Sequence, residues 1–319
     1  MNILVTALGT LNSTFISKHL KKCGNFIVGV DIYPKNYIKT SEEIDKFYQV
    51  PSIYEMERYT EELFNICKTN KIDTLIPIID EEIEYFSKNK DRFKNIGVDI
   101  CTPEYETVKL CRNKLLTFEL IKNKIPEVYI KTQLFKNINK DNISYPSFAK
   151  PVSGRASIGC EKITDKITFE YINHKVDPST FILQDFVEGE FYAVDFIREA
   201  KTKKFNCVAR QELVRNKNGC GTVVKIVDDI NLKRYTKEIA EILNYNGVGN
   251  IEFIKQNDNY YMLEVNPRFP AGTAYTVMSG ADFINDEIKI IKNREVDLKY
   301  DVKVNAIYTR RYETYEYTK

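Results

Sequence analysis

The sequence predicts two domains, an α/β domain with a parallel sheet followed by a larger region of the α+β class. Strand-type and helix-type segments alternate over residues 1–108, which is typical of a parallel sheet with helices on both faces. Residues 248–272 (VGNIEFIKQNDNYYMLEVNPRFPAG) have instead the pattern of a β-hairpin, two strand-type runs around a polar turn. A chain of 319 residues has room for two domains with their own cores, at about 150 residues per domain.

The composition argues against several classes of function. The 47 basic and 45 acidic residues nearly balance, so we expect no nucleic-acid partner. No apolar run reaches the ~18 residues of a membrane span, and the first residues read as a strand, so we expect a cytoplasmic protein without membrane contact. Seven cysteines without a C-x-x-C motif indicate reduced thiols and no zinc site. Two histidines give little support to serine–histidine or cysteine–histidine catalysis.

Four strands and three helices are expected in the first domain. The strands are at residues 3–7, 26–31, 74–79 and 98–101, and the helices at residues 15–22, 57–70 and 81–90. The turn after the first strand contains one glycine, Gly9, where a dinucleotide fingerprint needs three. A nicotinamide-dependent oxidoreductase is therefore disfavoured, although Asp31 ends the second strand as a ribose-binding acid would.

Three acids, Asp80, Glu81 and Glu82, follow the third predicted strand. They lie at the edge of the sheet where open α/β proteins bind ligands. The alternative interpretation, which we favour, is that they stabilise the positive end of the next helix dipole.

The hairpin brings acidic side chains together. We expect its strands at residues 250–255 and 260–266. Since strand side chains alternate between faces, Glu264 and Asn266 share one face, and a three-residue turn at residues 257–259 would place Glu252 opposite Glu264. Like charges this close repel each other unless a cation lies between them, and oxygen ligands of this type suit Mg²⁺. The alternative is an ordinary edge hairpin with solvated acids.

Arg268 follows the hairpin after Pro267 and would offer a fixed positive fork to a phosphate or carboxylate. The motif E-x-N-P-R at residues 264–268, with Glu252 a dozen positions earlier, resembles the metal-binding end of the ATP-grasp superfamily. The closest resemblance is to its carbamoyl-phosphate-synthase-like members. The resemblance implies a Rossmann-like pre-ATP-grasp domain at residues 1–108, a small lid subdomain with a linker helix at 109–187, and a large subdomain with the metal site and C-terminal tail at 188–319.

The resemblance also gives roles to two segments that would bind phosphate. Residues 109–125 are predicted to form one helix, and Lys114 matches a family lysine that reaches the nucleotide phosphates; otherwise it is a solvated helix lysine. Residues 145–159 (YPSFAKPVSGRASIG) match the family pattern P-x-x-x-K-P followed by a small-residue loop. Lys150, Ser153, Gly154 and Ser157 would then bind ATP. A Walker A loop is excluded, because Cys-Glu follows Gly159 where Lys and Ser/Thr are required.

Residues 181–190 (FILQDFVEGE) match the family linker that cups the adenine. The resemblance assigns ATP binding to Gln184, Phe186, Val187 and Glu188. The ribose contact falls on Glu190 when the alignment follows the turn, and on Phe191 when it follows the next strand; we choose Glu190.

Residues 205–225 are expected to form two strands around a polar loop. Arg210 and Arg215 lie in this segment and would approach the substrate in similar proteins. Further helices are expected at residues 232–243 and 281–293, and a strand at residues 302–309.

The function that the resemblance implies is that of an ATP-dependent, ADP-forming ligase. A small carboxylate would be activated as an acylphosphate and attacked by an amine or a similar nucleophile, with Lys150 and Arg268 as catalytic groups. The cofactors would be ATP and Mg²⁺, which Mn²⁺ could replace, held by Glu252, Glu264 and Asn266. The partners would be these small molecules and, by analogy, a second copy of the chain. An ATP-binding regulatory protein without turnover and carbamoyl-phosphate-type synthesis are the alternatives.

Overall fold

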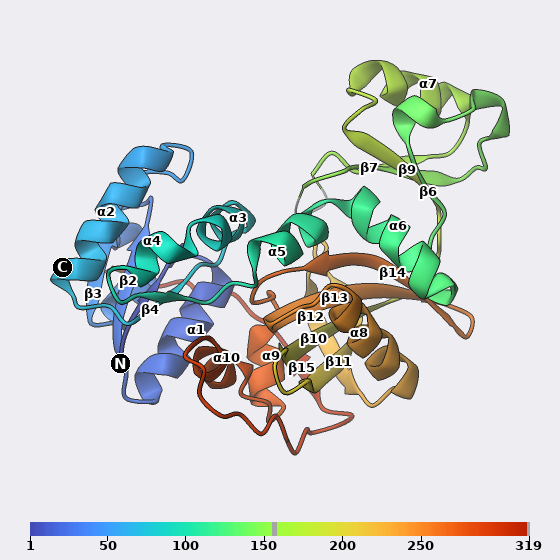
Figure 1. The fold of residues 1–319 in the computed structure, drawn as a ribbon. Coiled ribbons are helices and arrows are strands. Elements are labelled where there is room, and N and C mark those ends of the chain that lie inside the picture. The colour runs from blue at the N-terminus through green and yellow to red at the C-terminus, as the bar shows by residue number, and fades with distance from the viewer. Residues whose placement is uncertain (155–157, 318–319) are drawn as a thin grey trace.

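The computed structural model describes residues 1–154 and 158–317, and its three sheets are shown in Figure 1. The first domain contains a five-stranded sheet in the order β3-β2-β1-β4-β5, and every pair in it is parallel. This confirms the predicted Rossmann-like class. Its strands are β1 (Asn2–Val5), β2 (Phe26–Asp31), β3 (Lys46–Gln49), β4 (Thr74–Ile76) and β5 (Asp99–Ile100).

Helices cover both faces of this sheet because its strands are apolar on both sides. The alternation along β1 decides which helix covers which face. Ile3 and Val5 share a buried cluster with α1, whereas Leu4 lies in a second cluster with α2. The helices of this domain are α1 (Leu11–Lys22), α2 (Met56–Thr69), α3 (Asp80–Lys88), α4 (Lys90–Lys94) and α5 (Tyr105–Arg112).

The prediction of a single helix at residues 109–125 is wrong. The helix α5 ends at Arg112, and α6 (Lys114–Lys124) begins after a break at Asn113. Asn113 has an extended backbone (φ −103°, ψ 94°), and its side chain accepts a hydrogen bond from the Leu116 amide. Asparagine is a strong N-cap because its side chain replaces a missing helical acceptor. The break makes Lys114 the first residue of α6.

The described part of the lid consists of an antiparallel sheet in the order β6-β9-β7-β8, the α-helix α7 (Lys166–Lys175) and two short 3-10 helices, Phe135–Asn137 and Lys140–Asn142. It has a small core of its own, in which Phe135, Phe169 and Leu183 are buried. In Figure 1 it stands away from the other two sheets, at the upper right. Its strands are β6 (Thr132–Leu134), β7 (Ser147–Pro151), β8 (Glu161–Ile163) and β9 (Phe181–Asp185).

The third sheet has six antiparallel strands in the order β14-β13-β10-β11-β12-β15. Its strands are β10 (Glu190–Glu199), β11 (Lys204–Arg215), β12 (Gly221–Val227), β13 (Gly247–Gln256), β14 (Asn259–Asn266) and β15 (Ile307–Thr309), and its helices are α8 (Ile230–Ile242), α9 (Thr273–Met278) and α10 (Phe283–Ile291). Along β10, Val194 and Phe196 pack in the cluster of α8, while Ile197 packs toward α10. The two faces of this sheet therefore have different partners.

The first domain and the six-stranded sheet share one apolar core. Ile16 and Leu20 of α1 lie in the same buried cluster as Phe283 and Ile284 of α10. The cluster also includes Phe269, from the segment that follows β14. These two parts are therefore packed as one body.

Among the helices described, none has the length and apolar character of a membrane span.

The hairpin of β13 and β14 has the predicted pairing of Glu252 with Glu264 but not the predicted turn. Gln256 pairs with Asn259, so the turn has two residues, and Asn257 takes a positive φ of 55°. A regular ladder from this turn would place Glu252 opposite Leu263. A bulge makes Leu263 an extra residue, so Glu252 pairs with Glu264. A bulge shifts the register by one residue and so changes which side chains share a face.

Gly189 joins the lid to β10, and we predict that it accepts no side chain. A Cβ atom at this position would lie 1.9 Å from the carbonyl oxygen of Lys255, so the backbone would have to move, at a cost of about 1–3 kcal/mol. Gly189→Ala should lower Tm in a thermal melt. The exposed neighbour Glu188 provides the control: Glu188→Ala should leave Tm unchanged, and equal Tm values for both variants would contradict the prediction.

Candidate active site

A cavity of about 210 Å³ lies between the lid and the six-stranded sheet. Side chains from the lid, α6 and strands β10, β11, β13 and β14 line it, and most of them belong to an apolar set or a charged set. The apolar set is Ile130, Phe148, Pro151, Ile158, Phe186, Val187, Phe191, Ile254 and Leu263. The charged set is Lys114, Lys150, Asp185, Arg215, Glu252 and Glu264. An apolar wall with a few convergent charged groups is typical of a small-molecule site.

The two lysines of the charged set come from different elements. Lys150, on β7, is only 6% exposed, and its Nζ donates to the carbonyl oxygen of Leu263 at 3.1 Å. Burial lowers the pKa of Lys150 to about 8, although the nearby Glu264 opposes this effect. Lys114 Nζ lies 3.3 Å from the carbonyl oxygen of Gly154 and 3.6 Å from Glu264 Oε2.

The two acids of the hairpin face each other across β13 and β14. Burial, together with the charge of Glu264, raises the pKa of Glu252. Arg215 Nη2 lies 3.2 Å from Glu252 Oε2, and Asn266 Nδ2 donates to Glu264 Oε1 at 3.3 Å. A pair of opposed carboxylates with an adjacent amide fits a hard divalent cation, because the cation removes the repulsion that raises the pKa.

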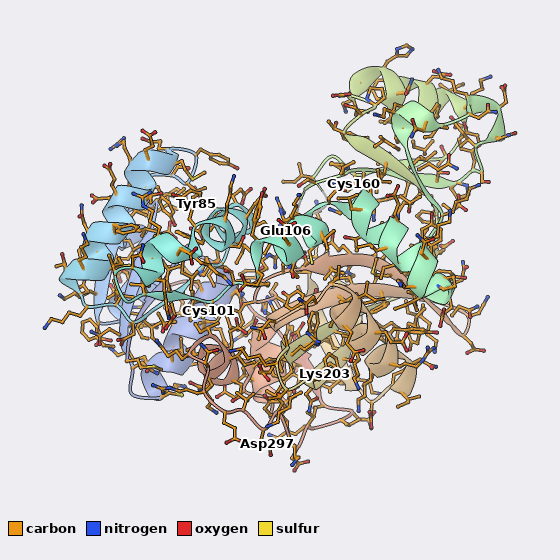
Figure 2. All side chains as sticks on the ribbon, viewed as in Figure 1. Tyr85, Cys101, Glu106, Cys160, Lys203 and Asp297 are labelled. Carbon is orange, nitrogen blue, oxygen red and sulfur yellow. The ribbon has the colours of Figure 1, made fainter. Side chains whose placement is uncertain are left out.

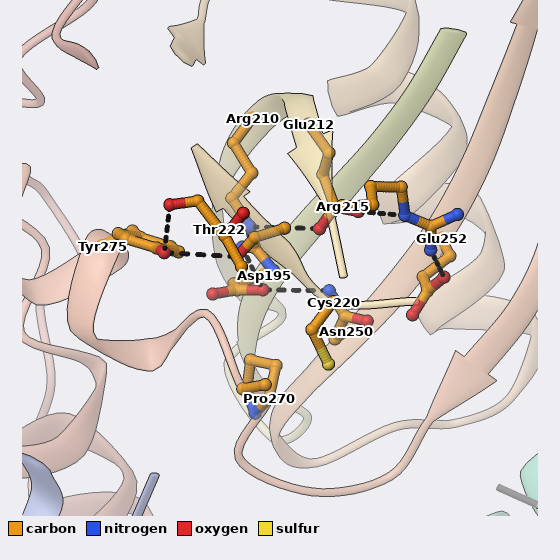
Figure 3. Close-up of polar contacts among 12 residues, drawn as sticks. Asp195, Arg210, Glu212, Arg215, Cys220, Thr222, Asn250, Glu252, Pro270 and Tyr275 are labelled. Atoms are coloured by element: carbon orange, nitrogen blue, oxygen red, sulfur yellow. Dashed lines mark hydrogen bonds and ion pairs between the residues drawn. The ribbon is translucent and has the colours of Figure 1, made fainter. Parts of the chain in front are cut away.

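A second cavity, of about 60 Å³, adjoins the first at Glu252. Arg268, Cys220 and Tyr275 line it, and Figure 3 shows its polar contacts. Arg210 also lines this cavity, and its Nη1 lies 2.6 Å from Asp195 Oδ1. The charge of Arg210 is therefore balanced by Asp195 within the wall of the second cavity.

Arg215 lines the first cavity and contacts two acids that line the second, Glu212 and Glu252. Its Nε lies 2.7 Å from Glu212 Oε2, in addition to the contact with Glu252. Its guanidinium carbon also lies 3.9 Å from the centre of the Phe191 ring in the first cavity.

The structure brings together most of the residues predicted from the sequence. The residues of the predicted site that line the first cavity are Lys114, Lys150, Gly154, Gln184, Phe186, Val187, Arg215, Glu252 and Glu264. The second cavity is lined by Arg210, Glu252, Asn266 and Arg268.

Three predicted ATP-binding residues, Ser153, Glu188 and Glu190, lie outside the lining of the first cavity. Ser153 is exposed and does not line the first cavity, and Ser157 lies outside the described residues. Glu188 and Glu190 line a shallow depression beside Lys255. Glu190 accepts a hydrogen bond from Tyr192, two residues along β10, and so lies on the face opposite to Phe191. Phe191, to which the alternative alignment assigned the ribose contact, is the residue that lines the first cavity.

Several lining residues were missed by the sequence analysis. Phe148 lies two positions before Lys150 on β7 and so shares its face, a signal that strand periodicity could have provided. Cys160, labelled in Figure 2 where the lid joins the rest of the molecule, also lines the first cavity. Leu263 reaches it because of the bulge, for which the sequence gives no signal.

Comparisons with known proteins agree with this geometry. The family described as "ATP-grasp domain" matches residues 111–272, just over half of the chain, and the family described as "PylC-like, N-terminal domain" matches residues 3–101. The chain therefore belongs to the ATP-grasp family.

Individual relatives are distant. The carbamoyl phosphate synthase large chain of Clostridium acetobutylicum is 24% identical over an alignment of 293 residues, and the match covers 82% of this chain and 26% of that protein. The tyramine–L-glutamate ligase of Methanocaldococcus jannaschii is 23% identical over an alignment of 258 residues, and the match covers 73% of this chain and 81% of the ligase. The chain thus spans about a quarter of the first relative and most of the second.

The fold is also found in solved structures. The biotin carboxylase domain of 2-oxoglutarate carboxylase from Hydrogenobacter thermophilus, a dimer in complex with MgADP, ADP and bicarbonate, superposes with a TM-score of 0.77. The two chains are 15% identical, and the match covers 96% of this chain and 73% of the other. This similarity establishes the fold.

We predict that metal-free ATP binding weakens as the pH rises through about 8. Only the protonated Lys150 attracts phosphate, and burial lowers its pKa to about 8, so its charge is lost above that pH. Calorimetric titration with ATP in EDTA, from about pH 7 to about pH 9.5, should show the loss of affinity. Lys150→Arg should remove the pH dependence, because arginine keeps its charge. An equally pH-dependent affinity in this variant would contradict the assignment.

Proposed function

We propose that the protein is an ADP-forming ligase that activates a small carboxylate as an acylphosphate and joins it to an amine or a similar nucleophile. One observation carries the proposal. Two lysines and two opposed carboxylates (Lys114, Lys150, Glu252 and Glu264) converge at the charged side of a cavity between the lid and the six-stranded sheet. Phosphoryl transfer requires positioning and neutralisation of charge more than covalent help from the protein.

The first cavity would bind ATP. Its apolar wall, with Phe186, Val187 and the buried Gln184, suits a purine base. Lys114 and Lys150 would hold the phosphates as point charges, with the segment at Gly154 beside them. The MgADP bound by the Hydrogenobacter thermophilus relative supports a nucleotide in this fold.

Glu252, Glu264 and Asn266 would hold Mg²⁺, which Mn²⁺ could replace. When bound, the ion would supply Lewis acidity and a template for the phosphate oxygens. The carboxylates must be ionised to bind it, and the pKa of Glu252 is raised. Metal binding should therefore release a proton and become tighter as the pH rises.

The second cavity would bind the carboxylate substrate. A carboxylate oxygen would attack the γ-phosphorus, the bond to the bridging oxygen of ADP would break, and an acylphosphate would form. The amine would then attack the acyl carbon and release inorganic phosphate. Arg268 would stabilise the negative charge on the transferring phosphoryl group, and Arg210 and Arg215 would shape the substrate side of the site.

The lengths of the relatives favour ligation over carbamoyl phosphate synthesis. The chain covers 81% of the tyramine–L-glutamate ligase but only 26% of the carbamoyl phosphate synthase large chain. A single unit of this size has a counterpart in the ligase, so an amino acid or another small carboxylate is the substrate class that we propose.

The product of ATP consumption tests the reaction class. The purified protein would be incubated with Mg-ATP and pools of amino acids and small carboxylates, and the nucleotide product identified. ADP and phosphate that appear only with a particular pool would support the acylphosphate route. AMP and pyrophosphate would instead indicate adenylate chemistry. Tight ATP binding without turnover in any pool would favour a regulatory role.

We predict that Glu264→Ala lowers turnover by about 10²–10³-fold, the range found when one stabilising group of a transition state is removed. The matched control is Asp258→Asn, which removes an exposed acid from the turn of the same hairpin. The control should retain the activity of the unmodified protein. Unchanged turnover in Glu264→Ala would contradict the metal assignment, and both variants should have the circular dichroism spectrum of the folded protein.

A further inference from the structure

The segment after β14 is held by two side chains of the first domain. Asp80 Oδ1 lies 3.0 Å from Arg268 Nε, and Asn12 Nδ2 donates to the carbonyl oxygen of Phe269 at 2.9 Å. Asp80 is 3% exposed and Asn12 is 9% exposed. Both contacts are therefore shielded from water. A hydrogen-bonded ion pair in such a buried place is stronger than the same pair at the surface.

Both side chains come from the carboxyl edge of the parallel sheet. Asn12 is the second residue of α1, which follows β1, and Asp80 is the first residue of α3, which follows β4. The strands β1 and β4 are neighbours in the sheet. Open α/β sheets bind their ligands at this edge. In this protein, the edge contacts residues 268 and 269 of the same chain.

Asp80 also lies near a second guanidinium. Arg112 Nη1 is 3.5 Å from Asp80 Oδ1, and Arg112 lies two residues before Lys114. The same carboxylate thus contacts Arg268, which lines the second cavity, and the last residue of α5, which leads into the helix of Lys114. Phe269, next to Arg268, is 3% exposed and lies in the core shared by the first domain and the six-stranded sheet.

We propose that Asp80 is a positioning residue for Arg268, and that the first domain serves this reaction by fixing the arginine at the phosphoryl site. The inference rests on the proposed function for the role of Arg268, while the contact itself is independent of it. Fixing one nitrogen of a guanidinium sets the direction in which its fork can point. A displacement of about 1 Å at a reacting centre lowers a rate by about 10²-fold.

The test compares two isosteric changes on α3. Asp80→Asn removes the charge that holds Arg268, whereas Glu84→Gln removes the charge of a half-exposed acid that lies 3.6 Å from Arg112. We expect kcat of Asp80→Asn to fall by about 10–100-fold, with KM for ATP changed by less than about 2-fold. Glu84→Gln should leave both unchanged. The assay uses Mg-ATP with an equimolar mixture of the common L-amino acids.

A double mutant separates positioning from a general structural role. If Asp80 acts through Arg268, Asp80→Asn should cause no further loss of turnover in an Arg268→Lys background, because the two residues then act as one unit. Equal losses in both backgrounds would overturn the inference. Unchanged kcat in Asp80→Asn, with turnover in the unmodified protein, would also overturn it.

A second measurement does not depend on turnover. The Nε–H resonance of Arg268 can be observed in protein labelled with ¹⁵N-arginine and identified by its loss in Arg268→Lys. Asp80→Asn should shift this resonance and speed its exchange with water, and Glu84→Gln should not. Asn12→Ala, which removes the contact with Phe269, provides a second variant if Asp80→Asn does not fold. Absence of turnover in the unmodified protein with every pool of amino acids and small carboxylates would refute the proposed function, while an unshifted resonance would refute the Asp80 contact.

Discussion

The opposition of Glu252 and Glu264 is the constraint on which the rest of the site depends. The charge of Glu264 contributes, after burial, to the raised pKa of Glu252, so a fold that pairs these like charges needs cations nearby. Lys114 and Arg215 lie 3.6 Å and 3.2 Å from these acids. The bulge at Leu263 creates the opposition, and the carbonyl oxygen of the same residue binds Lys150. One irregular residue therefore fixes both the acids and a lysine.

The site lies between two bodies of unequal stability. The first domain and the six-stranded sheet share a large apolar core, whereas the lid has a small separate one. The lid reaches the rest of the molecule through a few contacts, such as Lys150 with Leu263 and the amide of Lys114 with the carbonyl oxygen of Val152. The acids are thus carried by the rigid body, and Lys150 is carried by the lid. Regions with few buried apolar contacts open at a lower cost in free energy. We therefore expect the lid to be the part that moves when a nucleotide enters the cavity.

Local patterns in the sequence predicted the fold class and the two acids, but not the contacts between distant segments. The alternation of strands and helices gave the parallel sheet, and the hairpin pattern gave Glu252 and Glu264 as partners. The bulge that makes this pairing possible has no signal in the sequence, whereas the break at Asn113 has a local cause, the N-cap of that asparagine, which the prediction of one continuous helix overlooked. The choice between Glu190 and Phe191 for the ribose contact is a one-residue register question, and a slip of one residue reverses every side chain of a strand.

The first domain shows how a ligand-binding edge can be used within one chain. Asp31, which ends β2 as a ribose-binding acid would, is buried and accepts hydrogen bonds from the amides of Gly9 and Tyr33. Its carboxylate is thus bound to the turn that a dinucleotide would approach. Beside it, Asn12 and Asp80 contact the segment that carries Arg268. At this edge, where other α/β proteins bind a ligand, the side chains of the first domain bind parts of the same chain, and one of them contacts the arginine of the neighbouring site.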